Sequence, residues 1–509
     1  MIDLNNKNTE SKGTANMNVK LQQQANTPNK QQVDKLTNWI IVLPYPTTAK
    51  SIKQIPYGDI LKARRQRQDN KGPDKNPVVL DLPNKQGSRV SLACIKTDIS
   101  SFELLTLARK LVGSHGDHKI KEIGIAICGF NTKNAERIAE GIIAAALAAN
   151  AEMPQFKSKS KSKRGQQKLY LYGIKTTHGF KRGFAEAEGN ALARSLSMLP
   201  SNMLTPADYL KRVKQLAKEN KWKLDFYDIK ALKNKKAGAF LAVAQGSPTQ
   251  DAGIVRLRYT PPSSSRKGML ALVGKGICYD TGGTNLKSAN YMFGMHEDMQ
   301  GSAVALGTLL ALSRLKVNFP VECWMALAMN HIGPKAYKPN DIVTASDGTT
   351  IEIVHTDAEG RMVLADTLAM VSKLKPKLII DYATLTGACV YSLGTAYSGV
   401  FTNQDKLIPK LVQAGRDSGE RVWPFPMDED YDELIKSDIA DVKQCSRESG
   451  SDHILASRFL QRFVKDNIQW IHIDLASSNR KGGLAHIPTE TTGFGVRYSM
   501  HLLLDEKII

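Results

Sequence analysis

The C-terminal part of the chain alternates short apolar runs with helical patterns, and this alternation restricts the fold more than any other feature. Runs with the length and composition of buried strands are Met269–Val273, Val321–Met329, Leu378–Tyr382 and Trp470–Leu475. Helical periodicity lies between or after them, near residues 301–315, 361–374 and 453–464. Doubly buried strands separated by helices are typical of a parallel sheet covered on both faces. We therefore expect a large C-terminal α/β domain with a central, mostly parallel sheet covered by helices.

The segment before residue 185 repeats the alternation on a smaller scale. Its strand candidates are Trp39–Leu43, Val90–Ile95, Ile123–Ile127 and Leu169–Tyr172, and its helix candidates are Phe102–Leu111 and Ala135–Ala149. We expect a smaller, variable N-terminal α/β domain over residues 35–185 and the C-terminal domain over residues 186–509. A helix over Phe184–Met198 connects them, and Thr205 caps the next helix. Residues 1–34 are rich in Asn and Gln and poor in large apolar residues, so we expect a disordered tail there.

The apolar runs are too short for a membrane protein. The longest, Ile142 to Ala149, falls far short of the roughly 18 residues that a membrane span requires. The first residues lack the apolar stretch of a secretory signal. The six cysteines form no C-x-x-C pair, as expected of reduced core residues. With 509 residues, of which 42% are hydrophobic, the chain is expected to be a soluble, cytoplasmic protein of two or three domains.

Positive charge is concentrated in the N-terminal part. The net charge is +21, of which residues 1–190 contribute +15 and residues 191–509 contribute +6. Two basic runs, Lys62–Arg67 and Lys157–Arg164, lie between better patterned segments. They are either solvated loop charges or a surface for phosphate backbones, because clustered Lys and Arg bind nucleic acid through counterion release. No zinc-finger or RNP pattern accompanies the runs, so any DNA binding would be non-specific.

Several common catalytic motifs are absent. The glycine-rich segment Val273–Lys287 matches neither the P-loop nor the G-x-G-x-x-G dinucleotide pattern. The run His296–Gln300 lacks the second histidine of H-E-x-x-H, and no G-x-S-x-G occurs. These absences argue against nucleotide, zincin and α/β-hydrolase chemistry.

Carboxylates and cations crowd two segments that adjoin predicted strands or helices. Asp280 and Lys287 follow the strand candidate at Met269–Val273, and the segment Val354–Arg361 precedes a helix. If Val354–Arg361 is extended, Asp357, Glu359 and Arg361 share one face. Taken alone, this octapeptide could also be a surface ion pair.

Four carboxylates beside glycine-rich turns require compensating positive charge. They are Asp280, Asp298, Asp357 and Glu359. Packing them into one cleft without cations would be severely unfavourable, and oxygen ligands suit Mn, Mg or Zn. Two divalent ions balance four carboxylates and leave Lys287 and Arg361 as free cations. Such a site is suited to hydrolysis of a carbonyl compound by an activated water.

At these residues the sequence resembles the leucyl aminopeptidase family of two-metal peptidases, also called cytosol aminopeptidases. The similarity covers most of residues 190–480. It is carried by the motifs at 273–276, 280–283, 298–301, 356–361, 383–388 and 437–441. The resemblance implies that the C-terminal domain is a metallopeptidase domain that removes N-terminal residues from peptides. It also implies a homohexamer.

The resemblance assigns a role to each matching position. One tightly held ion would be bound by Lys275, Asp280, Asp298 and Glu359, and a more exchangeable ion by Asp280, Asp357 and Glu359. The ions would be Mn or Zn, and Lys275 can ligate only as the neutral amine. Lys287 would polarise the scissile carbonyl, and Arg361 would hold a bicarbonate that acts as general base. Substrate contacts are expected from Met295, Thr384, Leu385 and Gly387.

The chain departs from the family pattern near the site. The family usually has Asn where His355 stands, Ser at Thr281 and Pro at Ser288. None of these changes removes a metal ligand. We expect His355 to be a packed, hydrogen-bonded side chain, with tuning of the metal cluster as the alternative.

Overall fold

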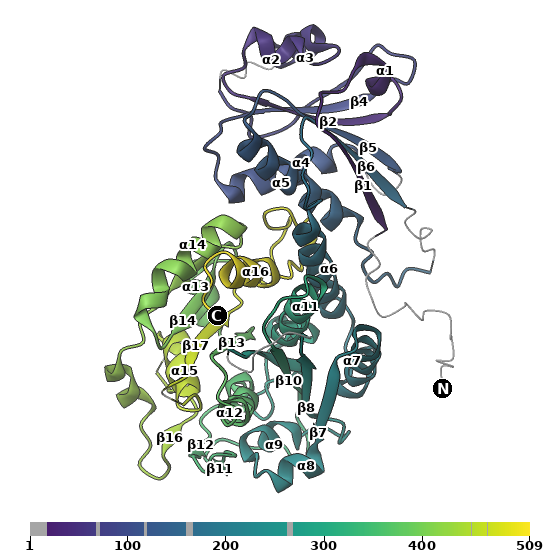
Figure 1. Ribbon diagram of the computed structural model, residues 1–509. Helices are drawn as coiled ribbons and strands as arrows, with labels where there is room; N and C mark the ends of the chain where they lie inside the picture. The colour runs from purple at the N-terminus through teal and green to yellow at the C-terminus, as the bar shows by residue number, and fades with distance from the viewer. Residues whose placement is uncertain are drawn as a thin grey trace.

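The computed structural model describes residues 18–67, 72–116, 120–158, 166–261, 268–448, 450–465 and 467–509. They form a smaller N-terminal and a larger C-terminal α/β domain, which lie one above the other in Figure 1. The expected fold class is confirmed. Within the described ranges, no helix has both the length and the apolarity needed to cross a membrane.

The N-terminal domain is built on a six-stranded sheet of order β1-β6-β5-β2-β4-β3. Only β3 runs antiparallel to its neighbour. The strands are β1 (Val19–Gln24), β2 (Asn38–Pro44), β3 (Val78–Asp81), β4 (Arg89–Ile95), β5 (Glu122–Ile127) and β6 (Gln167–Tyr172). The helices are α1 (Lys30–Val33), α2 (Ala49–Lys53), α3 (Gly58–Gln66), α4 (Ser101–Gly113) and α5 (Thr132–Asn150). All four strands and both helices expected here are present.

The expectation of a disordered tail is wrong for residues 18–34, and residues 1–17 lie outside the described residues. Strand β1 pairs in parallel with β6 at the edge of the sheet. Its Val19 and Leu21 pack against the domain core, while the alternate residues are exposed. A capping box at Asn29 starts α1. An edge strand needs apolar side chains on only one face, so the glutamines of β1 made its sequence look like that of a polar tail.

The C-terminal domain contains an eight-stranded sheet of order β15-β14-β17-β13-β9-β10-β8-β7. The four expected strands are its parallel centre, whereas β14, β8 and β7 each run antiparallel to an inner neighbour. The strands are β7 (Lys223–Asp228), β8 (Gly253–Tyr259), β9 (Leu270–Asp280), β10 (Val321–Asn330), β13 (Leu378–Ala383), β14 (Ser398–Thr402), β15 (Val422–Pro424) and β17 (Gln469–Asp474). A small sheet joins β11 (Ile342–Thr344), β12 (Thr350–Glu352) and β16 (Val442–Lys443).

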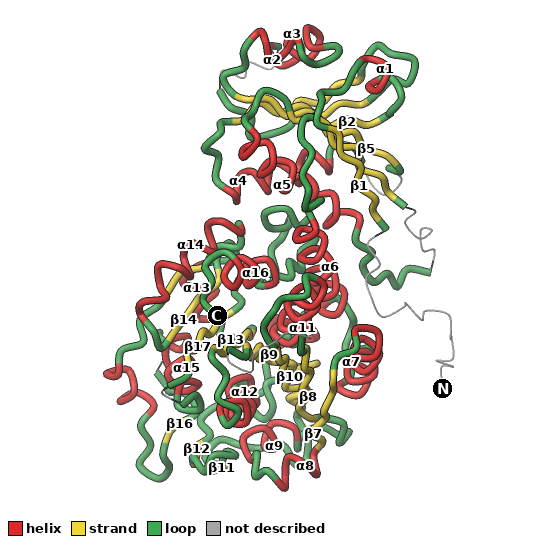
Figure 2. Tube along the Cα trace, viewed as in Figure 1, coloured by secondary structure: helices red, strands yellow, loops and turns green. Residues whose placement is uncertain are grey.

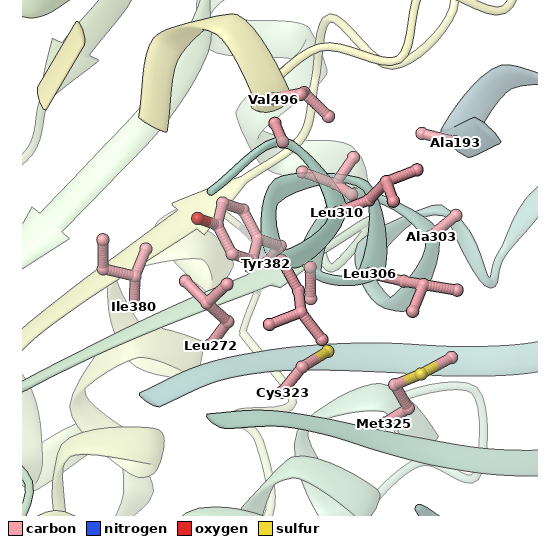
Figure 3. Close-up of a cluster of buried hydrophobic side chains, with 14 of the residues drawn as sticks. Ala193, Leu272, Ala303, Leu306, Leu310, Cys323, Met325, Ile380, Tyr382 and Val496 are labelled. Carbon is pink, nitrogen blue, oxygen red and sulfur yellow. The ribbon is translucent and has the colours of Figure 1, made fainter. Parts of the chain in front are cut away.

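Helices cover both faces of this sheet (Figure 2). One face packs against α7 (Pro206–Asn220), α11 (Gln300–Arg314), α14 (Ile408–Ser418) and α16 (Val496–Leu504). The other packs against α8 (Ile229–Asn234), α9 (Gly238–Ala244), α12 (Glu359–Ser372) and α15 (Asp452–Gln461). The short helices α10 (Ala289–Met292) and α13 (Gly387–Leu393) follow β9 and β13. Figure 3 shows Leu306 of α11 on the side of the helix toward Met325 of β10. Thr205 caps α7 as expected.

Helix α6 (Lys181–Ser197) connects the two domains, so the boundary expected at residue 185 falls inside a helix. Its middle crosses α11 without side chains between the two backbones. A Cβ on Gly189 would lie 2.3 Å from the carbonyl oxygen of Gly307, and a Cβ on Gly307 would lie 2.4 Å from that of Gly189. Only glycine allows this approach. The connection is therefore rigidly packed into the larger domain.

Candidate functional site

The chemistry-bearing residues gather at the carboxyl edge of the central parallel strands. Asp280 ends β9, Asn330 ends β10 and Asp474 ends β17. A cavity of ≈ 850 Å³ opens there. Every predicted metal, catalytic and substrate residue lines it: Lys275, Asp280, Lys287, Met295, Asp298, Asp357, Glu359, Arg361, Thr384, Leu385 and Gly387. This is the edge at which ligands bind in such sheets.

Asp280, Asp357 and Glu359 form the centre of the carboxylate cluster. Each offers an oxygen atom, and these atoms lie within 4.8 Å of one another. Asp280 Oδ1 accepts hydrogen bonds from the Gly282 amide and from Asn330 Nδ2, both at 2.8 Å. These two contacts fix the carboxylate that the resemblance assigns to both ions.

Lys275 lies within β9 and reaches into the same cluster. Its Nζ is 2.8 Å from Asp298 Oδ2 and 2.8 Å from Glu359 Oε1, and it donates to the Thr384 carbonyl at 2.9 Å. Gly360 leaves room for this side chain, because a Cβ there would lie 2.7 Å from Lys275 Cε. Lys275 is therefore held among the groups that it is predicted to join in metal binding.

Lys287 lies on the opposite side of the cluster, after the glycine turn. Its Nζ is 2.9 Å from Asp280 Oδ2 and also contacts Asp357 Oδ1. Burial alone would lower the pKa of Lys287, but Asp280, Glu359 and Asp357 outweigh burial and raise it. Lys287 is consequently a protonated, preorganised donor.

The carboxylates carry more negative charge than the buried site tolerates. Burial, together with Asp280 and Glu359, raises the pKa of Asp357 to about 7 although Lys287 opposes the shift. Burial raises the pKa of Asp298 well above its usual range. Burial opposes the charge of Lys275, but Asp298, Glu359 and Asp280 outweigh burial and raise its pKa. The cluster therefore favours additional cations.

A divalent metal fits these residues. Glu359 Oε2 is buried and has no hydrogen-bond partner within the described part of the chain. A buried carboxylate oxygen without a partner is costly, and a metal ion would satisfy it. The donors are carboxylate oxygens and one amine, a set that can bind a divalent cation.

The extended conformation expected for Asp357–Arg361 is wrong. Asp357 lies in a turn, and α12 begins at Glu359, so Glu359 and Arg361 belong to the first helical turn. The turn is held by Thr356, whose Oγ1 donates to the Gly282 carbonyl at 2.6 Å. Asp357 and Glu359 still converge because of this turn, whereas Arg361 points to a different partner.

Arg361 is ion-paired with Asp452, which the sequence did not indicate. Its Nη2 lies 2.8 Å from Asp452 Oδ1 and 3.0 Å from Oδ2, and its Nη1 donates to the Gln444 carbonyl at 3.1 Å. Burial opposes the charge, but Asp452 raises the pKa of Arg361. Asp452 therefore occupies Nη2 of Arg361, one of the donors that a bicarbonate would use, and bicarbonate binding stays a prediction.

The loop after β13 forms the substrate side of the cavity. Thr384 Oγ1 donates to Asp298 Oδ1 at 2.6 Å, which links the expected pocket to the metal cluster. Asp474 Oδ1 accepts from the Leu385 amide at 3.1 Å and Oδ2 accepts from Thr386 Oγ1 at 2.7 Å. Sequence reasoning missed Asp474, although its place at the end of a predicted strand was a usable signal.

His355 is exposed at the cavity and is not packed, contrary to expectation. Its Nδ1 accepts a hydrogen bond from the Asp357 amide at 3.3 Å. Partial desolvation of the ring at the cavity wall and the charge of Lys287 lower the pKa of His355.

Known proteins share both the site-bearing domain and the overall architecture. The chain is 42% identical to a probable cytosol aminopeptidase of Wolbachia pipientis over 61% of this chain and 63% of that protein. It is 35% identical to a probable cytosol aminopeptidase of Afipia carboxidovorans over 88% and 90% of the two chains. A solved mutant of tomato leucine aminopeptidase superposes with a TM-score of 0.83 and 27% identity over 96% of each chain. The bottromycin maturation enzyme BotP, solved in complex with Mn, superposes with a TM-score of 0.79 and 28% identity over 92% of this chain and 99% of that chain.

The fold is that of the aminopeptidase class of hydrolases. The catalytic-domain model of the cytosol aminopeptidase family matches residues 191–500. The chain belongs to the cytosol aminopeptidase family, and the expected resemblance is confirmed.

Proposed function

We propose that the chain is a metal-dependent aminopeptidase that hydrolyses the N-terminal residue from peptides by means of a water activated by two divalent ions. The observation that carries this proposal is the convergence of four carboxylates and two lysines in one cavity at the carboxyl edge of the sheet. The unpartnered Glu359 Oε2 supports metal binding. The solved relative in complex with Mn supports the same class of ion.

The ligand sets are those that the family resemblance assigns, and all of their members line the cavity. Lys275, Asp280, Asp298 and Glu359 would hold the tighter ion, and Asp280, Asp357 and Glu359 the exchangeable one. Lys275 is charged while it lies between Asp298 and Glu359, so it must release a proton to become a ligand. When bound, the ions act as Lewis acids and lower the pKa of a bound water.

Lys287 would stabilise the negative charge that develops on the scissile carbonyl oxygen. Its ammonium group contacts Asp280 and Asp357, two of the carboxylates that would bind the ions, so it lies next to the place where the reaction would occur. The Leu385 carbonyl and the Thr384 side chain would orient the substrate from the opposite wall. Met295 and Gly387 would border the pocket for the N-terminal side chain.

Further properties are proposed from the family. A homohexamer is supported by large apolar side chains that are exposed near the cavity, among them Phe293 at 92% and Tyr391 at 80% exposure. Mn or Zn is the expected ion, and the cytosolic naming of the relatives supports a cytoplasmic location.

DNA binding stays an untested prediction. Arg65 of the first basic run is ion-paired with buried Asp74, which gives it a structural role. The second run lies outside the described residues from Lys159 onward.

The decisive experiment is hydrolysis of a panel of aminoacyl amides after chelation and reloading with Mn, Zn, Co or Mg. Activity should vanish on chelation and return with at least one ion. Full turnover by the chelated protein would refute the proposed mechanism. Asp280→Ala or Glu359→Ala should abolish activity because each removes a ligand shared by both ions.

A further inference from the structure

The ion pair between Arg361 and Asp452 places a fixed carboxylate inside the cavity. Both side chains line the cavity together with Lys287 and Asp357. The Arg361 side chain is 2% exposed, whereas that of Asp452 is 40% exposed. The pair therefore joins a buried cation to a carboxylate that still faces the solvent of the cavity.

Arg361 has the chemistry of an anion site. A buried guanidinium binds planar oxyanions through its parallel N–H groups. Here both carboxylate oxygens of Asp452 accept hydrogen bonds from Nη2, and the Gln444 carbonyl accepts one from Nη1. The Nε atom of Arg361 is buried without a hydrogen-bond partner within the described residues. A dissolved anion that uses Nη2 would have to displace Asp452, which is tethered to the chain and therefore present at high effective concentration.

We infer that Asp452 takes the place of a dissolved anion at Arg361 and serves as the proton acceptor for the attacking water. This inference rests on the proposed aminopeptidase function. Asp452 belongs to α15, whereas the proposed metal ligands come from β9, from α12 and the turn before it, and from the segment before α11.

The proton balance of the reaction is complete with Asp452 as acceptor. As the water oxygen bonds to the scissile carbonyl carbon, one water O–H bond breaks and its proton passes to Asp452 Oδ. When the C–N bond breaks, the same proton passes to the leaving nitrogen, and the carboxylate is restored. Arg361 holds the carboxylate in place through both steps.

The test compares the metal-loaded parent chain with Asp452→Ala and Asp452→Asn in buffer freed of carbon dioxide, with and without added bicarbonate. Asp432→Ala is the matched control, because it also removes an aspartate that is ion-paired with an arginine. Asp432 pairs at 2.8 Å with Arg458, which lies in α15 as Asp452 does, and Asp432 does not line the cavity. Thermal unfolding of each variant establishes that it is folded. Binding of ¹³C-labelled bicarbonate, followed by NMR, gives a readout independent of activity.

We expect bicarbonate to leave the kcat of the parent chain unchanged. Asp452→Ala should lower kcat by about 100-fold, a typical loss for a general base, and added bicarbonate should restore much of it. Asp452→Asn should be equally slow but not restored, because its amide fills the space without accepting a proton. Asp432→Ala should retain parental kcat and remain indifferent to bicarbonate.

The inference is overturned if bicarbonate activates or binds the parent chain, if Asp452→Ala keeps full kcat without bicarbonate, or if folded Asp452→Ala neither binds bicarbonate nor regains activity from it. If the parent chain shows no peptidase activity with any metal, the proposed function fails. Labelled bicarbonate bound by Asp452→Ala and not by the parent would still establish that Asp452 occupies the anion position.

Discussion

Replacing Gly360 by Ala tests whether Lys275 is a metal ligand. The new Cβ would lie 2.7 Å from Lys275 Cε, 2.8 Å from Cδ and 2.8 Å from Nζ. Carbon atoms in contact normally lie about 3.5–4.0 Å apart, so the end of the lysine must move by roughly 1 Å. It cannot move without loss, because Asp298, Glu359 and the Thr384 carbonyl hold it.

The expected result is a folded protein with a weakened metal site. The clash falls on the end of a side chain and not on the backbone, so the chain should still fold, with an unfolding temperature lowered by the loss of the buried contacts of Lys275. Displaced supporting groups typically cost about 10- to 100-fold in metal affinity, and a 1 Å misplacement costs about 100-fold in rate. Metal content after dialysis against a chelator, measured by mass spectrometry, and kcat at saturating metal would report the two effects.

Gly183→Ala provides the matched control. Gly183 is also helical, but a Cβ there meets nothing within 4 Å. Alanine should stabilise that helix by up to about 1 kcal/mol without altering metal content. If Gly360→Ala retains its metal and its kcat as Gly183→Ala does, the placement of Lys275 in the metal site is wrong.

Three further results are expected. Lys287→Ala should keep its metal and lose about 100- to 1,000-fold in kcat, whereas Lys275→Ala should lose the tighter ion; equal metal loss in both variants, measured by metal analysis, would contradict the assigned roles. Asp474→Ala should raise KM for aminoacyl amides with metal retained, because it frees the loop that carries Leu385; an unchanged KM would argue against this positioning role. Burial, aided by the charge of Arg89, lowers the pKa of His115 to about 4, so the unfolded chain binds more protons than the folded one as pH falls from 6.5 to 4. Stability should therefore decline over that window by up to about 3 kcal/mol, and His115→Gln should flatten the decline in denaturant titrations; an equally steep profile would exclude His115 as its source.

The sequence predicted the centre of the fold better than its edges. The inner strands of the eight-stranded sheet are buried on both faces, so β9, β10, β13 and β17 can be recognised in the sequence as continuous apolar runs. The edge strands bury only one face. For this reason β1, whose sequence is VKLQQQ, could not be distinguished from a polar tail.

The site was predictable where its residues lie close together in the sequence. Asp280 and Lys287 share one turn, and Asp357 and Glu359 share another, so their motifs are visible as short patterns. Their conformation was not visible, because a turn followed by a helix and an extended strand can both bring alternate residues together. Asp452 lies 91 residues after Arg361 and belongs to no local pattern, so its contact arises only from the packing of α12 against α15.

The contact between Gly189 and Gly307 determines how the protein can be divided. A chain cut at residue 185 would begin inside α6 and would lose Arg182, which pairs with Glu186 at 2.7 Å and with Asp505 of the C-terminal tail at 2.7 Å. It would also uncover Ala485, which packs against Leu105 and Ala144 of the N-terminal domain. Any experiment that removes the N-terminal domain must therefore leave α6 whole, and a loss of activity on its removal cannot be attributed to that domain until the newly exposed surface has been made polar.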